Sequence, residues 1–351
     1  SYWSDAMTSR ERVMTAFSHE QPDRVPAWRG ASPEFIAKAK RLLGITSDEE
    51  LSGRFGDDFR RVFAAAAGTD RPLDDGVTYR SVFGVDRHGF GYGMPMGHPL
   101  AGASLAQVHD YAWPDPRAVD VSRVRTDALA WRGEYAILGG DWSPYWHDAI
   151  DLMSMEGLLL AMHDQPEIVD ALLQHIVDYY FEAGRRVFGA AGNGIDIFFI
   201  GNDFGSQRCP LVSPAMFRQF LLPQLARLVR LGHDYGLKVM LHCCGNFAAL
   251  IPDMIGVELD ALQALQPCGR GMEAESLKLQ FGSDLVFAGC IDSHHVLIQG
   301  TPASVRDETR RVLDIMMPGG GYVLSASHDW LLEETPVENV LAMFDVPRGY
   351  T

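Results

Sequence analysis

Several features that would place this chain in a common class of protein are missing from its sequence. No apolar run reaches membrane-spanning length, and the first residues lack the basic and apolar segments of a secretory signal. We therefore expect a cytoplasmic protein with no membrane partner. Positive charge is also scarce, because 30 Lys and Arg oppose 46 Asp and Glu, giving a formal net charge of −16 without any compensating basic cluster. Nucleic acid is not an expected partner, since phosphate binding needs a basic surface.

Cysteine and nucleotide-binding patterns are equally sparse. The chain has five cysteines, an odd number with one adjacent pair, which is a poor disulfide framework and suits a reducing compartment. There is no Gly-x-Gly-x-x-Gly after a strand, no Walker A sequence and no Gly-x-Ser-x-Gly elbow. These absences argue against a dinucleotide site, a phosphate-binding loop and an α/β-hydrolase nucleophile.

The second half of the chain alternates short apolar runs with helical stretches. The composition, 47% hydrophobic and 22% charged over 351 residues, is that of a globular protein with a large core. The sequence predicts strands at 195–200, 238–241, 260–265, 285–288 and 322–325, and helices after Ser213 and at 247–255, 272–281, 302–316 and 336–344. Such alternation implies βαβ units and a parallel sheet, either a barrel or an open doubly wound sheet.

The first half is less regular. Strands are predicted at 24–28, 58–65 and 136–140, with a helix at 32–43 that Ser32 caps. Residues 67–134 would then be an insertion between the second and third strands, and a structureless loop of that length is uncommon. We expect a β-hairpin there, with arms at 78–82 and 89–92, lying over the barrel mouth. No linker divides the chain, so 1–351 is expected to be one domain.

The most informative local pattern is Leu241-His242-Cys243-Cys244-Gly245-Asn246, at the end of a predicted strand. Side chains alternate along a strand, so His242 and Cys244 point to one face and Cys243 to the other. Imidazole and thiolate are preferred zinc ligands. The competing interpretation is that these cysteines are buried as small hydrophobic residues, and two ligands alone do not make a metal site.

Other reactive residues fall at the ends of neighbouring predicted strands. His328 and Cys290 could each supply a further ligand, although Cys290 beside Gly289 could instead be packed in the core and His328 could bind substrate without a metal. Asp203, Asp292 and Asp141 also follow strands. Acids in such positions serve as general bases, as partners of ligand side chains, or as helix caps, which is their commonest role.

These pieces together resemble the superfamily of uroporphyrinogen decarboxylase and the zinc-dependent corrinoid methyltransferases. The resemblance covers nearly the whole chain, is weakest between about residues 70 and 134, and rests on the following segments: residues 7–12 and 22–26, Ile200-Gly201-Asn202-Asp203, His242-Cys243-Cys244-Gly245-Asn246, Gly289-Cys290-Ile291-Asp292, residues 319–328 and residues 335–339. It implies a single TIM-type (β/α)₈ barrel with the active site at the carboxyl ends of the strands.

The methyltransferase branch matches better, because its members resemble this chain in carrying His-x-Cys on the fifth strand and a third zinc ligand after the eighth. The resemblance implies zinc bound by His242, Cys244 and His328, with Cys290 as the alternative to His328. The third ligand in that branch is usually cysteine, so a histidine here is a departure from its pattern. Zinc would activate a thiol or polarise an ether oxygen, and a corrinoid on a partner protein would donate or take the methyl group.

Roles for the remaining polar residues follow from the same resemblance. Asp203 and Asp292 are expected to be catalytic or to orient His242, and Arg29, Asp141 and Asn246 are expected to bind the substrate. The alternatives are a metal-free decarboxylase of a porphyrinogen or another carboxylated aromatic compound, and a binding protein on a degenerate barrel. The methyl donor, the acceptor and the direction of transfer are left open.

Overall fold

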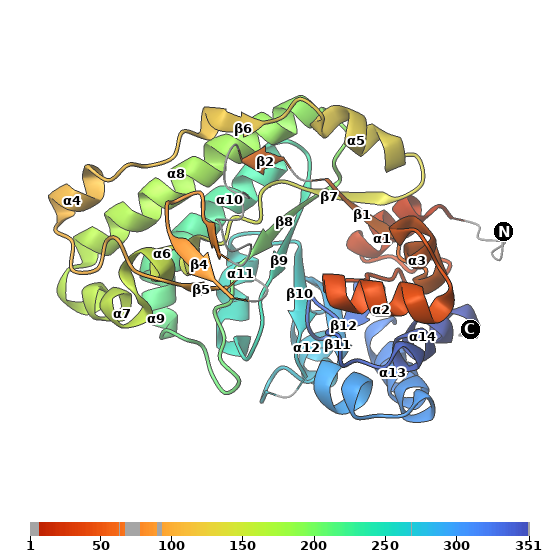
Figure 1. Cartoon of the computed structure of the whole chain (residues 1–351). Helices are drawn as coiled ribbons and strands as arrows, with labels where there is room; N and C mark the ends of the chain where they lie inside the picture. Colours follow the sequence, from red (N-terminus) through yellow and green to blue (C-terminus); the bar gives the residue numbers. More distant parts are fainter. Residues whose placement is uncertain (1–6, 63, 67–77, 90–92, 268, 350–351) are drawn as a thin grey trace.

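A curled parallel sheet with helices outside it forms the centre of the molecule (Figure 1). The structure is a computed structural model, and it describes residues 7–62, 64–66, 78–89, 93–267 and 269–349. Within these residues the main sheet has seven strands, in the order β1 (Phe59–Val62), β7 (Ala136–Gly139), β8 (Ile197–Gly201), β9 (Lys238–His242), β10 (Ala261–Leu265), β11 (Val286–Ile291) and β12 (Tyr322–Ala326). The predicted alternation of strand and helix is thus confirmed from β7 onward.

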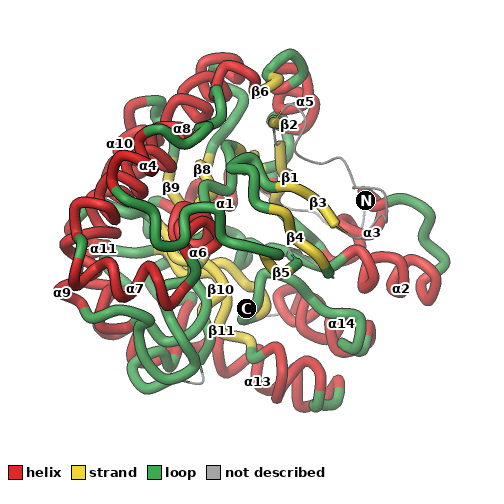
Figure 2. Tube along the Cα trace, turned by 60° about the vertical axis from the view of Figure 1, so that its left-hand side comes forward, coloured by secondary structure: helices red, strands yellow, loops and turns green. Residues whose placement is uncertain are grey.

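Helices surround the sheet, and the strands gather inside them in Figure 2. The α-helices are α1 (Ser9–Phe17), α2 (Pro33–Leu43), α3 (Asp48–Phe55), α4 (Leu105–His109), α5 (Val124–Trp131), α6 (Tyr145–Met153), α7 (Met155–Asp164), α8 (Pro166–Ala191), α9 (Pro214–Met216), α10 (Leu222–Asp234), α11 (Ile251–Gly256), α12 (Ala274–Phe281), α13 (Pro302–Met316) and α14 (Val337–Asp345). Shorter helical turns are η1 (Pro116–Ala118), η2 (Phe217–Leu221), η3 (Ala248–Leu250), η4 (Ser293–Ile298) and η5 (Val346–Gly349). Ser32 caps α2 as predicted, since its side chain accepts a hydrogen bond from the Phe35 N–H.

The first predicted strand, 24–28, is wrong as a strand of the sheet, but its central residues lie between the two edge strands. Leu324 N–H of β12 donates to Pro26 O at 2.8 Å, and Trp28 N–H donates to Leu324 O at 3.0 Å. On the other side, Asp58 N–H donates to Ala27 O at 2.9 Å. Pro26 has no N–H to donate, so a longer ladder cannot form here. The two edges of the sheet are therefore joined by a single-residue bridge at Ala27.

One buried carboxylate anchors this junction. Asp58 is fully buried and accepts hydrogen bonds from Arg12 at 2.9 Å, from Arg24 at 2.8 Å and 2.9 Å, and from the Ala27 N–H at 2.8 Å. A buried charge is tolerated when it is paired and hydrogen-bonded in this way. The Asp58 cluster thus fixes the segment 26–28 against β1.

The core has two layers, and the layer to which a side chain belongs determines whether it can reach the barrel interior. Inside the sheet, Trp28, Phe59, Phe199 and Met240 pack with smaller residues, and Trp142 packs against them. The larger layer lies between the strands and the helices. Because side chains alternate along each strand, neighbouring residues divide between the interior and the outer layer.

The segment between β1 and β7 differs in detail from the predicted hairpin. β2 (Ala65–Ala66) pairs antiparallel with β6 (Val119–Asp120), outside the main sheet. The strand predicted at 58–65, which is β1, therefore ends before Ala65. β3 (Thr78–Arg80) pairs with β4 (Asp86–His88), and β4 pairs with β5 (Met94–Pro95). The second arm is therefore β4, since Gly89 has φ +107° and ends the strand. The proposed arm at 89–92 falls mostly outside the described residues, as do 67–77.

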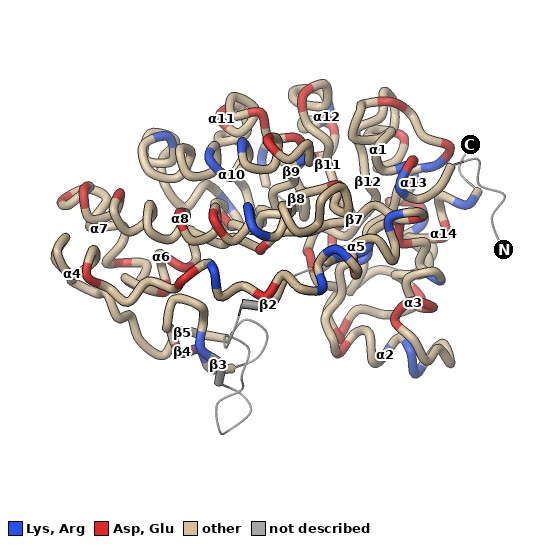
Figure 3. The backbone as a smooth tube through the Cα atoms, turned by 90° about the horizontal axis from the view of Figure 1, so that it is seen from above, with Lys and Arg blue, Asp and Glu red and all other residues tan. Residues whose placement is uncertain are grey.

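The surface carries mixed charge, because Lys and Arg are interspersed with Asp and Glu over several helices (Figure 3). Across the described residues, no helix combines the length and the apolar character needed to cross a bilayer.

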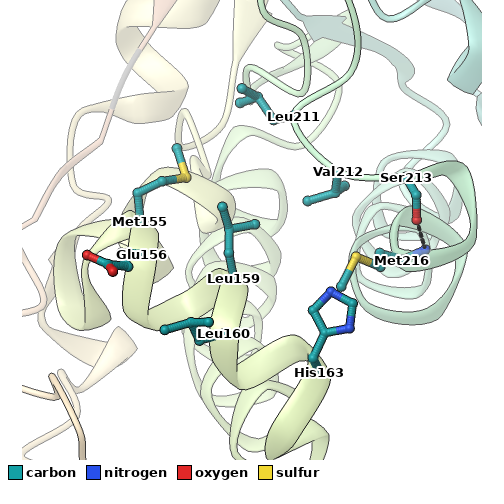
Figure 4. A pocket seen from close by; sticks show the side chains of 9 residues that line it. All are labelled: Met155, Glu156, Leu159, Leu160, His163, Leu211, Val212, Ser213 and Met216. Carbon is teal, nitrogen blue, oxygen red and sulfur yellow. Dashed lines mark hydrogen bonds between the residues drawn. The ribbon is translucent and has the colours of Figure 1, made fainter.

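An apolar pocket of about 650 Å³ lies between α7 and the start of α9, lined chiefly by Met155, Leu159, Leu160, Val212 and Met216 (Figure 4).

Candidate metal centre

The His-Cys-Cys-Gly motif turns sharply where β9 ends. His242 is the last residue of β9, and Gly245 has φ +81°, a conformation that favours glycine. A Cβ at Gly245 would lie 2.6 Å from the Ser206 carbonyl oxygen, so the loops after β8 and β9 meet here without room for a side chain. The turn brings the Cys244 thiol back to the histidine, with Sγ 3.3 Å from His242 Nε2.

Three donor atoms converge at this point. An imidazole nitrogen of His242, the sulfur of Cys244 and a carboxylate oxygen of Asp203 all lie within 4.8 Å of one another. Within the part of the chain that the structure describes, this is the one group of at least three such residues that could hold a metal ion. Nitrogen, sulfur and oxygen donors at this spacing are the ligands that zinc accepts in proteins.

Asp203 is held in place by the loop it faces. It follows β8, the neighbour of β9 in the sheet, and its Oδ1 accepts a hydrogen bond of 2.7 Å from the Cys244 N–H. The same carboxylate lies 3.4 Å from His242 Nε2 and 3.4 Å from His147 Nε2, the latter on α6. Asp203 therefore connects the metal-binding motif with the helix that follows β7.

The charges of these residues reinforce one another. Burial alone would raise the pKa of Asp203, but the bonds from His147 and His242 outweigh it and hold that pKa well below its ordinary value. Burial would lower the pKa of His242, yet the neighbouring Cys244 and Asp203 raise it well above the ordinary value. Burial raises the pKa of the Cys244 thiol. A metal cation would therefore replace protons here, since ligands bind in their deprotonated forms.

The other ring nitrogen of His242 is also occupied. Its Nδ1 lies 2.6 Å from Gln263 Oε1, and Gln263 Nε2 donates to Asp329 Oδ1 at 3.2 Å. Asp329 in turn pairs with Arg61 at 3.2 Å. The Trp142 ring lies beside the imidazole, with centroids 5.2 Å apart.

The structure separates Cys243, Cys290 and His328 from this group. Cys243 is buried in the outer core layer, opposite His242, as alternation predicts. Cys290 lies within β11, which extends beyond the predicted end at 288, and it too packs in the outer layer; burial raises its pKa to about 12. The His328 ring is exposed, and its Nδ1 accepts a hydrogen bond of 3.1 Å from the Trp330 N–H.

The predicted substrate-binding and acidic residues are scattered in the same way. Arg29 extends to Ser52 at 2.9 Å and to Asp57, away from the barrel interior that Trp28 faces. The Asn246 amide joins two loops by donating to Arg208 O at 3.3 Å and Arg270 O at 3.2 Å. The structure thus brings neither residue to the metal-binding group.

Two of the predicted acids also lie elsewhere. Asp292 caps η4, accepting bonds of 2.8 Å from the N–H groups of His294 and His295. Asp141 is close enough to Asp148 to contribute to the raised pKa of that carboxyl, below the effects of burial and of Asp151. Of the three acids at strand ends, only Asp203 reaches the metal-binding group.

Sequence reasoning missed four residues that the structure places around the site: His147, Gln263, Asp329 and Arg61. Only Gln263 left a clear signal, because it is an amide within a short run of otherwise apolar residues in a buried strand. Such a polar residue needs a partner, and its partner here is His242.

A cavity of about 360 Å³ opens on the rim formed after β11 and β12. Its lining combines apolar and polar side chains: Ile298, Trp330, Leu331, Leu332, Gln207, Gln266, Asp292, Ser293, His294, His295, Ser327, His328, Glu334 and Thr335. Gln266 Oε1 also accepts a hydrogen bond of 3.1 Å from the Gly245 N–H, which ties the cavity wall to the metal-binding loop. A cavity of this size holds a small organic molecule.

The sequence profile of the uroporphyrinogen decarboxylase (URO-D) family matches residues 119–350. The chain belongs to this family. The relatives similar to this chain carry the names of methyltransferases and of decarboxylases, so the comparisons alone do not choose between these two activities.

Relatives of both kinds are found. "Methylcobamide:CoM methyltransferase MtaA" of Methanosarcina barkeri is 27% identical over 154 residues, covering 43% of this chain and 40% of that protein. "Methylated-thiol--coenzyme M methyltransferase" of Methanosarcina mazei is 23% identical over 255 residues, covering 70% and 63%. The chain thus spans less than two thirds of either protein. A "Uroporphyrinogen decarboxylase" of Xanthomonas euvesicatoria is 24% identical over 347 residues, covering 90% of each chain.

A solved structure supports the architecture. The "methyltransferase from Methanosarcina mazei" aligns with a TM-score of 0.70 over 98% of this chain and 99% of that chain, at 19% identity. At this identity the likeness shows the fold alone. It agrees with the curled parallel sheet described above.

Proposed function

We propose that this protein is a zinc-dependent methyltransferase that moves a methyl group between a small molecule, a thiol or a methoxylated compound, and a corrinoid carried by a partner protein. The observation that carries this proposal is the convergence of His242, Cys244 and Asp203 at the ends of two neighbouring strands. The methyltransferase relatives named above support the reaction class.

Zinc fits this set of donors. His242 and Cys244 supply nitrogen and sulfur as the sequence predicts, and Asp203 supplies the oxygen that completes a three-ligand catalytic set with one open position. His328 remains the alternative third ligand, and it would have to exchange its bond with the Trp330 N–H for the metal. When bound, zinc lowers the pKa of a thiol or polarises an ether oxygen.

The protein's own residues position the reactants. The 2.7 Å bond from the Cys244 N–H holds the Asp203 carboxylate beside the donor group, and the Trp142 ring lies next to the His242 ring in a tilted arrangement. The cavity at the rim would hold the body of the substrate. No Lys or Arg is among the described residues that line this cavity, so we expect its occupant there to be uncharged rather than anionic.

The insertion at 67–134 is proposed to cover the barrel mouth within a single domain spanning 1–351. Its described contacts support this, because Arg87 of β4 forms an ion pair with Asp151 of α6, the helix that also carries His147. His98 Nδ1 lies 2.8 Å from the Asp151 carbonyl oxygen, on the same helix. The insertion is thereby attached to an element that reaches Asp203.

A methyl-transfer assay tests the proposal. Methylcobalamin and a small thiol, or cob(I)alamin and a methoxylated compound, would be incubated with the zinc-loaded protein and followed by corrinoid absorbance. We expect turnover that is lost after chelation and in Cys244→Ala, and retained in the control Cys209→Ser, whose exposed thiol lies outside the donor group. Equal turnover with and without zinc, or decarboxylation of a porphyrinogen in its place, would contradict the proposal.

A further inference from the structure

One amide side chain, that of Gln263, is buried in the barrel interior among apolar residues. Gln263 is completely buried in β10, a strand whose other members are apolar. Ala261, two residues earlier, belongs to the interior core layer, so alternation directs Gln263 to the same interior. Burying an amide costs free energy unless its donors and acceptor are bonded, which means that the partners of Gln263 define its role.

Those partners determine which end of the amide faces His242. Gln263 Nε2 lies 3.2 Å from Asp329 Oδ1, and a carboxylate can only accept, so the nitrogen end must face Asp329. The oxygen end then lies 2.6 Å from His242 Nδ1 and requires a hydrogen on that nitrogen. Neutral imidazole, the form that binds a metal, carries one hydrogen, so in that form the lone pair lies on Nε2 and is directed at Cys244 and Asp203.

The carboxylate that fixes the amide is itself fixed. Asp329 is buried and pairs with Arg61 at 3.2 Å. The Arg61 guanidinium stacks on two interior rings, 4.5 Å from the Trp28 centroid and 5.2 Å from that of Phe199. A planar cation held on aromatic faces loses little further freedom when it bonds a carboxylate.

We infer that Gln263 is a positioning residue that holds His242 in the tautomer able to bind metal through Nε2, and that Asp329 and Arg61 set the orientation of the Gln263 amide. This inference rests on the metal-binding part of the proposed function. Ligand histidines commonly donate their second N–H to an oxygen acceptor, and loss of that acceptor weakens metal binding.

A neutral acceptor also suits the charge of the site. Thiolate and carboxylate from Cys244 and Asp203 together balance the two charges of a divalent cation. Gln263 adds no charge, and the negative charge of Asp329 is matched by Arg61. The chain thus supports the ligand without placing a third negative charge against the imidazole.

Zinc affinity tests the inference directly. It would be measured by competition with a chromogenic chelator for the wild type, Gln263→Met and the control Gln280→Met. Gln263→Met keeps the length of the side chain and loses the acceptor, so we expect roughly 10- to 100-fold weaker zinc binding. Gln280 is an exposed amide on α12, outside the metal-binding group and the rim cavity, so Gln280→Met should leave zinc affinity within about threefold.

Imidazole nitrogen resonances give a second readout, which a merely structural role would not change. In the zinc-loaded wild type, ¹⁵N-labelled histidine should show an exchange-protected Nδ1 proton on His242. That signal should disappear in Gln263→Met and in Asp329→Leu, where the amide is free to turn over, while circular dichroism stays unchanged. An unprotected Nδ1 proton in the wild type, or unaltered zinc affinity in Gln263→Met, would overturn the inference.

These outcomes separate the inference from the reaction. If the wild type binds zinc and transfers methyl groups but Gln263→Met binds zinc equally well, the inference is wrong and the proposed function stands. If zinc affinity depends on Gln263 but no methyl transfer occurs, the inference stands and the reaction is wrong. Failure of the wild type to bind zinc at all would overturn both.

Discussion

Asp148, on helix α6 next to His147, should make the stability of the fold depend on pH. Its side chain is buried and accepts a hydrogen bond of 2.5 Å from the Tyr180 hydroxyl. Burial, together with the nearby charge of Asp151, raises the pKa of Asp148 to about 8, against the lowering effect of the Tyr180 bond. We predict that Asp148→Asn stabilises the protein at neutral and alkaline pH and not at acidic pH.

The magnitude follows from the two pKa values. An unfolded aspartate has a pKa of about 3.9, and each pKa unit corresponds to about 1.4 kcal/mol. The folded protein holds the Asp148 proton more tightly than the unfolded chain does, so this proton contributes to the free energy of unfolding. The contribution is complete below about pH 4 and is lost as pH rises through about 8. Between pH 4 and pH 7 the loss amounts to about 4 kcal/mol, and Asp148→Asn should abolish it.

Urea unfolding followed by tryptophan fluorescence at several pH values measures this effect. The difference in unfolding free energy between Asp148→Asn and the wild type should be small at pH 4 and grow steadily toward pH 8. Asp164→Asn, which changes an exposed carboxyl on α7, serves as the control and should change the unfolding free energy by the same small amount at every pH. If the unfolding free energies of Asp148→Asn and the wild type varied in parallel with pH, the reasoning would be refuted.

Three other predictions follow from the contacts above. Asp58→Ala should lower the unfolding free energy by about 3–5 kcal/mol, because it leaves Arg12 and Arg24 without their buried partner; thermal unfolding beside the exposed control Asp307→Ala would measure it, and a loss equal to the control's would contradict it. Zinc binding should be weakened more by Asp203→Ala than by His328→Ala and should not change in Cys290→Ala. A larger loss in His328→Ala than in Asp203→Ala would instead make His328 the third zinc ligand. Zinc affinity should rise with pH, because the raised pKa of His242 means that a proton must leave before the metal binds, and a flat profile between pH 6 and pH 9 would exclude this.

The parts of the fold that sequence reasoning could predict are those in which local pattern and packing agree. From β7 onward, apolar runs of strand length alternate with capped amphipathic segments, and the strands appear within a few residues of the predicted bounds. The opposite directions of Cys243 and His242 follow from the alternation of a strand alone. Family membership was predicted from short motifs and is confirmed over residues 119–350.

The features that could not be predicted depend on contacts between distant segments. The strand predicted at 24–28 reduces to one bridge because Pro26 lacks a donor and Asp58 bonds the Ala27 N–H. The direction of the His328 ring depends on its bond with the Trp330 N–H, which loop sequence does not reveal. His147 reaches Asp203 only because α6 folds back over the end of β8, and no spacing in the sequence indicates this.

Metal analysis of the purified protein tests the central claim most directly. Elemental analysis by plasma mass spectrometry would be run on the wild type, Cys244→Ala and Cys243→Ala after identical dialysis against zinc. The account predicts about one zinc per chain in the wild type and in Cys243→Ala, and almost none in Cys244→Ala, because only the Cys244 sulfur lies beside His242 Nε2. A wild type without zinc, or equal losses in the two cysteine variants, would contradict it.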